Sequence, residues 1–246
     1  MTKYILPLMI GHILGDYYFQ TEKIAEEKEK SYRGIVIHSL VYILIMIVMM
    51  ALAFNKYFVC IGVIAAIVHF VIDSLKYVMI KKRVIKDGWY TFSIDQFLHV
   101  LTIAGLGFVC FKYSFDMNTT LFAKIMSTCS LDPIESLKVC TIILMIHKPA
   151  NVIIQKFLKE YKPITGKDKN SILATKNAGR TIGTIERVVM IILIYLQQYS
   201  ALGLVLTAKS ITRYNKIVED KEFAEYYLLG TLFSVVIVLV LSLLFL

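Results

Sequence analysis

The stretch YFVCIGVIAAIVHFVIDSLKYVMI, residues 57–80, is apolar over a length that can cross a membrane, yet it carries His69 and Asp73. A His and an Asp four residues apart lie on the same face of a helix, one turn above the other. Both side chains are costly to place in hydrocarbon, so such a pair in a membrane helix indicates a functional site.

The same spacing recurs in neighbouring apolar runs. His12 and Asp16 repeat it in the first run, and Asp95 and His99 give it in reverse order in the fourth. The second run carries His38. Four consecutive apolar segments therefore carry His, alone or with Asp.

The composition is typical of a polytopic membrane protein, because 57% of the 246 residues are hydrophobic and only 18% are charged. The mean hydropathy is +0.67. Repeated apolar runs of this length predict transmembrane helices. We expect an all-α membrane helix bundle with about eight spans, at residues 4–20, 35–54, 57–80, 94–113, 138–157, 183–198, 200–214 and 226–246. The run 4–20 is kept as a span because it has no small-residue cleavage site of a signal peptide.

Basic residues cluster in a few loops and predict the orientation. They follow the third span, fill the loop 22–33 (Lys23, Lys28, Lys30 and Arg33) and recur in the segment 148–180, whereas the loop 114–137 has only Lys124. We expect a multi-pass protein of the cell membrane with these basic loops in the cytoplasm and both termini outside. The net charge of +9 is explained by this signal and by anionic lipid head groups, so no nucleic-acid partner is expected.

This topology places the polar residues at a common depth. The seven His and Asp side chains all fall in the cytoplasmic half of their spans, where they could converge on one inward-facing cavity. Two halves are expected, 1–113 with the His/Asp set and 136–246 with a second bundle, divided by an external linker at 114–135. The four cysteines are scattered without paired spacing and predict neither disulfides nor a thiolate metal site.

Imidazole and carboxylate are ligands of zinc, iron and manganese, and pairs four residues apart offer two ligands from one helix. The set exceeds what one tetrahedral ion needs, so we expect about two or three ions, zinc first and iron or manganese as alternatives. Such ions would acidify a bound water and hold a phosphoryl oxygen. For each residue the alternative is a polar contact between helices. The predicted metal ligands are His12, Asp16, His38, His69, Asp73, Asp95 and His99.

Other polar residues are predicted to assist. Lys76, three residues after Asp73, could hold an anionic group or extend to the membrane surface. Tyr17, Gln20 and Gln96 are candidate hydrogen-bond partners that orient the ligands. In the second half, Glu186 or Glu225 could pair with a basic residue to fix the bundle, or the basic groups could grip a phosphate; these basic residues are Arg187, Lys209 and Arg213.

These residues carry a resemblance to a bacterial integral-membrane family, domain-of-unknown-function family 3307. The matching motifs of the first half are His12-xxx-Asp16-Tyr17 with Gln20, His38, His69-Phe70-xx-Asp73-xx-Lys76 and Asp95-Gln96-xx-His99. Those of the second half are Gly183-xx-Glu186-Arg187, Ala208-Lys209-Ser210-xx-Arg213 and Glu225-Tyr226-xxx-Gly230-Thr231. The resemblance implies a membrane protein but no activity. A looser likeness, by ligand type and spacing, is to membrane-bound metal-dependent hydrolases and to zinc-dependent phospholipase C and nuclease sites.

The favoured interpretation is an enzyme, a metal-dependent hydrolase that acts on a phosphoester of a lipid head group or of a small phosphate compound. The first alternative is a transporter or channel in which the same groups relay protons or pass a divalent cation. The second is a non-catalytic membrane effector or partner protein whose cluster holds the bundle together. The oligomeric state does not follow from the sequence.

Overall fold

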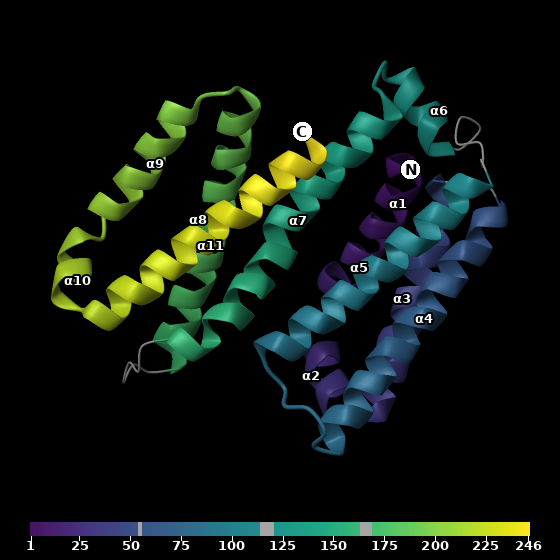
Figure 1. The fold of residues 1–246 in the computed structure, drawn as a ribbon, viewed down its shortest axis with the longest axis horizontal. Coiled ribbons are helices and arrows are strands. Elements are labelled where there is room, and N and C mark those ends of the chain that lie inside the picture. The colour runs from purple at the N-terminus through teal and green to yellow at the C-terminus, as the bar shows by residue number, and fades with distance from the viewer. Residues whose placement is uncertain (54–55, 114–120, 163–168) are drawn as a thin grey trace. The chain divides into compact units, whose positions relative to one another are not determined.

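The computed structural model describes residues 1–53, 56–113, 121–162 and 169–246. Helices dominate these residues and no strand occurs among them, which confirms the all-α prediction (Figure 1). The helices are α1 (Thr2–Ile13), α2 (Glu22–Lys30), α3 (Tyr32–Ala53), α4 (Lys56–Lys81), α5 (Trp89–Lys112), α6 (Leu121–Thr128), α7 (Pro133–Leu158), α8 (Lys169–Tyr195), α9 (Tyr199–Ile211), α10 (Tyr214–Glu219) and α11 (Lys221–Phe245). A π-helical turn, Leu14–Tyr18, extends α1, and a 3-10 turn, Lys159–Tyr161, follows α7.

The chain forms two compact units, Met1–Thr141 and Ile142–Leu246. The predicted division at the linker 114–135 stays a prediction, and residues 114–120 of that linker lie outside the described residues. So do residue 54 at the end of the second predicted span and residues 163–168 of the predicted basic segment.

Four helices of the first unit form a closed ring. The helix α1 packs against α3 and α5, and α4 packs against the same two helices from the other side. Buried apolar side chains such as Leu6, Met46 and Ile103 fill part of the space between them. The ring therefore places the inner faces of α1, α3, α4 and α5 opposite one another.

The helices of this ring carry the His and Asp side chains on their inner faces, beside buried apolar residues, and expose apolar side chains on their outer faces. On α3, Leu40 and Leu44 are 63% and 61% exposed, whereas His38 is fully buried. On α5, Phe97 is 65% exposed and Asp95 and His99 are buried. The apolar outer faces differ from the polar surface of a water-soluble bundle and fit a lipid environment.

Five helices are long and apolar enough to cross a membrane, and they coincide with predicted spans. They are Tyr32–Leu52, Val59–Lys81, Trp89–Lys112, Pro133–Tyr161 and Lys221–Phe245. The other predicted spans are also helical, but α1 and α9 have only 12 and 13 residues, and α8 carries Arg180, Glu186 and Arg187. The described residues thus contain five candidate membrane helices, and the count of eight spans stays a prediction.

Two local features differ from the sequence prediction. The predicted loop 22–33 contains the helix α2, which begins because the Thr21 hydroxyl accepts a hydrogen bond from the Ile24 N–H (3.3 Å). The first span does not continue as an α-helix, because the Phe19 N–H donates to the Leu14 carbonyl five residues earlier (2.8 Å). Such π turns are rare in proteins, and those that occur are often located at functional sites.

The second unit is built on α7, α8 and α11. Ile142, Ile146 and Leu241 form its buried core, and the rings of Phe157 and Phe233 stack with their centroids 4.4 Å apart. The helix α11 begins at Asp220, whose carboxylate accepts a hydrogen bond from the Phe223 N–H (2.9 Å). The helices α9 and α10 connect α8 to α11, packing against α8 and α11 respectively.

Candidate functional site

The structure brings all seven predicted metal ligands together inside the ring of α1, α3, α4 and α5. Every one of these side chains is buried, with side-chain exposures of 6% or less. They form three overlapping groups whose ligand atoms lie within 4.8 Å of one another: His12 with Asp16 and His69, His38 with His69 and Asp73, and Asp73 with Asp95 and His99.

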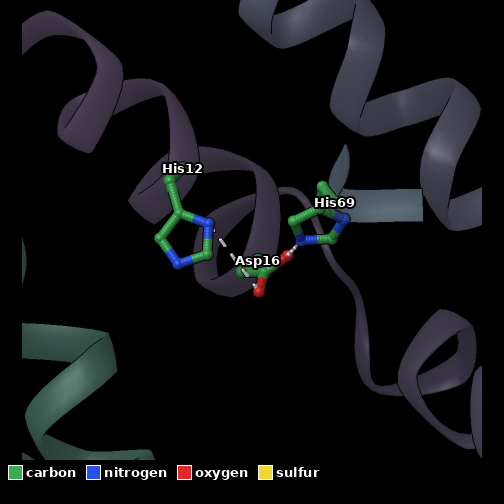
Figure 2. A group of neighbouring side chains, drawn as sticks. All are labelled: His12, Asp16 and His69. Atoms are coloured by element: carbon green, nitrogen blue, oxygen red, sulfur yellow. Dashed lines mark hydrogen bonds and ion pairs between the residues drawn. The ribbon is translucent and has the colours of Figure 1, made fainter. Parts of the chain in front are cut away.

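Asp16 is the centre of the first group (Figure 2). Its Oδ1 lies 2.9 Å from His69 Nε2 and 3.2 Å from His38 Nε2, and its Oδ2 lies 4.0 Å from His12 Nδ1. Asp16 belongs to the π turn after α1, so this turn determines how its carboxylate meets the imidazoles of α3 and α4.

Asp73 is shared by the second and third groups. Its Oδ2 lies 3.4 Å from His69 Nδ1 and 3.6 Å from His38 Nε2, and its Oδ1 lies 3.8 Å from His99 Nε2. His99 Nε2 lies 3.7 Å from Asp95 Oδ1. The Asp73–Asp95–His99 triad therefore turns two carboxylate oxygens and one ring nitrogen toward one another.

The three atoms of this triad are buried without a hydrogen-bond donor or acceptor among the described residues; they are Asp73 Oδ1, Asp95 Oδ1 and His99 Nε2. A buried polar atom without a partner costs about 1–3 kcal/mol. Two ligands at about 2.1 Å from a tetrahedral zinc ion lie about 3.4 Å apart, close to the separations within the triad. The donor set and its spacing thus fit a divalent metal ion.

His69 links the first two groups through its two ring nitrogens. Nε2 faces Asp16 and Nδ1 faces Asp73. A neutral imidazole donates from only one nitrogen and presents a lone pair at the other, so one of the two carboxylates meets a lone pair. A positive ion between nitrogen and carboxylate removes this repulsion.

Lys28 is a site residue that has no signal in the sequence, where it is only one of the basic residues of the predicted loop. Its Nζ lies 2.6 Å from Asp73 Oδ2. Burial tends to lower the pKa of the Lys28 ammonium, but the carboxylates of Asp73 and Asp16 outweigh this effect and raise the pKa above its ordinary value. Lys28 is therefore positively charged at neutral pH.

Lys76 and two of the predicted orienting residues surround Asp95. Lys76 Nζ donates to Asp95 Oδ2 (3.1 Å), and Gln96 Nε2 lies 3.4 Å from the same oxygen. The Tyr17 hydroxyl donates to Gln96 Oε1 (2.7 Å), so α5 is tied to the π turn. Gln20 is half-buried just after that turn.

Tyr42 is a second residue that sequence reasoning missed. Its ring stacks on His69 at 3.8 Å between centroids, and its hydroxyl lies 3.3 Å from His12 Nδ1. Gly15 makes room for it, because a Cβ at this position would lie 2.5 Å from the Tyr42 ring. His69 also stacks on His99 at 4.2 Å. The imidazole at the centre of the cluster is thus held on both faces.

The polar residues predicted for the second half belong to the unit Ile142–Leu246. Glu186 Oε2 pairs with Lys209 Nζ at 2.7 Å. The Arg187 side chain is buried and donates to the Ile146 carbonyl (2.6 Å) and to Asn151 Oδ1 (2.8 Å). Arg213 and Glu225 are exposed. These contacts agree with the role of fixing the bundle, while the substrate-binding role of Arg187, Lys209 and Arg213 and the orienting role of Glu186 and Glu225 stay predictions.

These features define an all-helical chain with five candidate membrane helices and a buried His/Asp cluster. The model of the family described as "Protein of unknown function (DUF3307)" matches residues 4–128, and the chain belongs to this family. The match confirms the resemblance and contains all seven residues of the cluster, whereas the motifs of the second half lie outside the matched residues. No curated protein and no solved structure matches the chain.

Proposed function

We propose that the chain is a membrane-embedded, metal-dependent hydrolase that acts on a phosphoester, either of a lipid head group or of a small phosphate compound. The observation that carries this proposal is the triad of Asp73 Oδ1, Asp95 Oδ1 and His99 Nε2, three buried ligand atoms that converge without hydrogen bonds among the described residues.

The charges of the cluster favour a cation. Lys28 and Lys76 neutralise Asp73 and Asp95, whereas Asp16 contacts imidazoles. With neutral imidazoles one carboxylate charge is left uncompensated in a buried site, and an unpaired buried charge is strongly unfavourable. A divalent ion reverses the sign of the site and makes it attractive to an anionic substrate.

The reaction class follows from the ligand types. Carboxylate and imidazole ligands without thiolates are typical of hydrolytic zinc and of iron or manganese. When bound, such ions supply an acidified water and a positive charge for a phosphoryl oxygen. Three overlapping groups can take about two or three ions, with His69 and Asp73 shared between neighbours.

The topology completes this proposal. We place the protein in the cell membrane with eight spans and both termini outside, because the basic loops then all lie in the cytoplasm. In this arrangement α1, α8 and α9 also cross the membrane, and the cluster opens toward the cytoplasm.

Two ammonium groups beside the triad favour an anionic substrate. The two lysine side chains are the more exposed partners of their ion pairs, at 16% and 23%, against 0% and 6% for Asp73 and Asp95. These positively charged groups attract a phosphate, which supports a hydrolase that acts on a phosphoester.

The test is metal analysis of the purified full-length protein together with hydrolysis of phosphate monoesters and diesters. We expect bound zinc, iron or manganese and a metal-dependent activity that Asp73→Ala abolishes and Asp87→Ala, at an exposed position of the α4–α5 connection, leaves unchanged. The proposal is wrong if the protein binds no transition metal and the Asp73→Ala variant has the same hydrolytic activity as the unaltered protein. Metal-dependent ion flux into liposomes without hydrolysis would favour the transporter.

A further inference from the structure

We propose that Lys28 and Lys76 form a recognition pair for a tetrahedral oxyanion, a phosphate group, beside the Asp73–Asp95–His99 triad. This inference rests on the proposed function and adds to it the residue of α2 that selects the substrate class. The two ammonium groups approach the triad from different elements, Lys28 from α2 and Lys76 from α4.

Each ammonium group binds the outer oxygen of one triad carboxylate. Lys28 contacts Asp73 Oδ2 and Lys76 contacts Asp95 Oδ2. The inner oxygens, Oδ1 of both residues, are thereby left to face His99 Nε2. Each ammonium group thus has two effects. It fixes the orientation of its carboxylate, and it keeps a positive charge adjacent to the predicted metal.

Both ammonium groups retain donors for a ligand. A lysine ammonium has three N–H donors, and one of them is used by the carboxylate. The triad atoms are buried, while the lysine side chains keep 16% and 23% of their surface exposed. These partly exposed lysines can present their remaining N–H groups to a phosphate beside the triad and form charge-assisted hydrogen bonds with its oxygens.

The position of α2 against α3 is fixed by a close approach of the two backbones. A Cβ on Gly34, at the start of α3, would overlap the backbone of Glu27 and Lys28, so only glycine permits this approach. The neighbouring Lys30 points elsewhere and pairs with Glu26 at 3.2 Å on an exposed face. Of these two lysines of α2, the one beside Gly34 is the one that reaches the cluster.

The experiment measures binding of inorganic phosphate to the Mn²⁺-loaded, full-length protein in nanodiscs of a zwitterionic lipid. We expect Lys28→Met and Lys76→Met each to weaken phosphate binding by about tenfold, the effect of one charge-assisted hydrogen bond. Lys28→Arg keeps the charge and N–H donors for a phosphate oxygen, so it should weaken binding less than Lys28→Met does. Lys30→Met removes a lysine from the same helix and should change nothing.

Gly34→Ala tests the role of α2 without removing a charge. It should weaken phosphate binding as much as Lys28→Met does, while Mn²⁺ still binds and reports a folded cluster. Gly88→Ala, where nothing lies within 4 Å of the added Cβ, is the matched control.

The outcomes separate this inference from the proposed function. Mn²⁺ binding with unchanged phosphate affinity in Lys28→Met overturns the recognition pair and leaves the metal centre intact. Failure of the unaltered protein to bind any of Mn²⁺, Zn²⁺ and Fe²⁺ overturns both. Two competitors of inorganic phosphate distinguish the source of the anion: phosphatidic acid in the nanodiscs and soluble glycerol phosphate. If phosphatidic acid competes, the ligand is a lipid head group, and if only glycerol phosphate competes, it is a small molecule. Either result supports the pair.

Discussion

At the scale of single residues, His69 has the most demanding position, because its two ring nitrogens face two different carboxylates while its ring is stacked between Tyr42 and His99. It belongs to two of the three ligand groups, whereas His12 belongs to one. His69 and His12 have the same spacing to an Asp in the sequence, but the geometry assigns His69 to more ligand groups than His12.

We predict that His69→Asn removes more bound metal than His12→Asn. The first substitution alters two groups that share a ligand, and the second alters one. The measurement is the metal-to-protein ratio of the purified variants by elemental analysis. Equal ratios in the two variants would contradict the shared-ligand arrangement.

A second prediction concerns two glycines in helical segments. Gly15→Ala should lower the free energy of unfolding by about 1–3 kcal/mol, because the added methyl group is pressed against the Tyr42 ring. Gly105→Ala, where nothing lies within 4 Å, should raise it by up to about 1 kcal/mol through helix propensity. Unfolding in mixed detergent micelles measures both, and a stabilised Gly15→Ala variant would refute the close contact.

At the scale of elements, the cluster was predictable because six of its seven residues form pairs at helical spacing in apolar runs, and His38 lies in a further apolar run. Lys28 and Tyr42 were not predictable in this way. Lys28 lies in a polar segment whose fold depends on its contact with α3, and Tyr42 is one of many aromatic residues in membrane helices. The π turn was also missed, because hydrophobic periodicity does not distinguish one widened turn from regular helix.

The contact between α7 and α8 gives a third prediction. Arg187→Met should lower the free energy of unfolding by about 3 kcal/mol or more, because the Ile146 carbonyl and Asn151 Oδ1 lose a charged donor in a buried site. Lys221→Met, at an exposed position, is the control. Detergent unfolding monitored by circular dichroism provides the measurement, and an unchanged midpoint for Arg187→Met would contradict the structural role.

At the scale of the whole molecule, the cluster lies within the unit Met1–Thr141, which also contains the family match to residues 4–128. Five of the predicted spans could be recognised from hydropathy alone, since their helices are long and apolar. The helices α1, α8 and α9 are shorter or carry charges, so composition does not decide their place in the membrane.

The proposed topology leads to a fourth prediction. In a variant whose only cysteine is Cys129, which is exposed in the region after α6, a membrane-impermeant maleimide should label intact cells from outside. A cysteine introduced at the exposed position of Lys82 should be labelled only after the cells are opened. Labelling of Lys82→Cys in intact cells would show that the orientation is the opposite of the proposed one.

The shortness of α1 has a consequence for the bilayer around the protein. The helix and its π turn comprise 12 and 5 residues, about 25 Å at roughly 1.5 Å per residue, against a hydrocarbon thickness of about 30 Å. Most side chains of α1 are buried among the neighbouring helices, so protein rather than lipid covers the end of this short segment. Since Asp16 lies in the final turn of this short segment, we expect the headgroup layer to lie close to the cluster in the proposed eight-span topology, where a phosphate of the membrane surface has a short path to the proposed metal site.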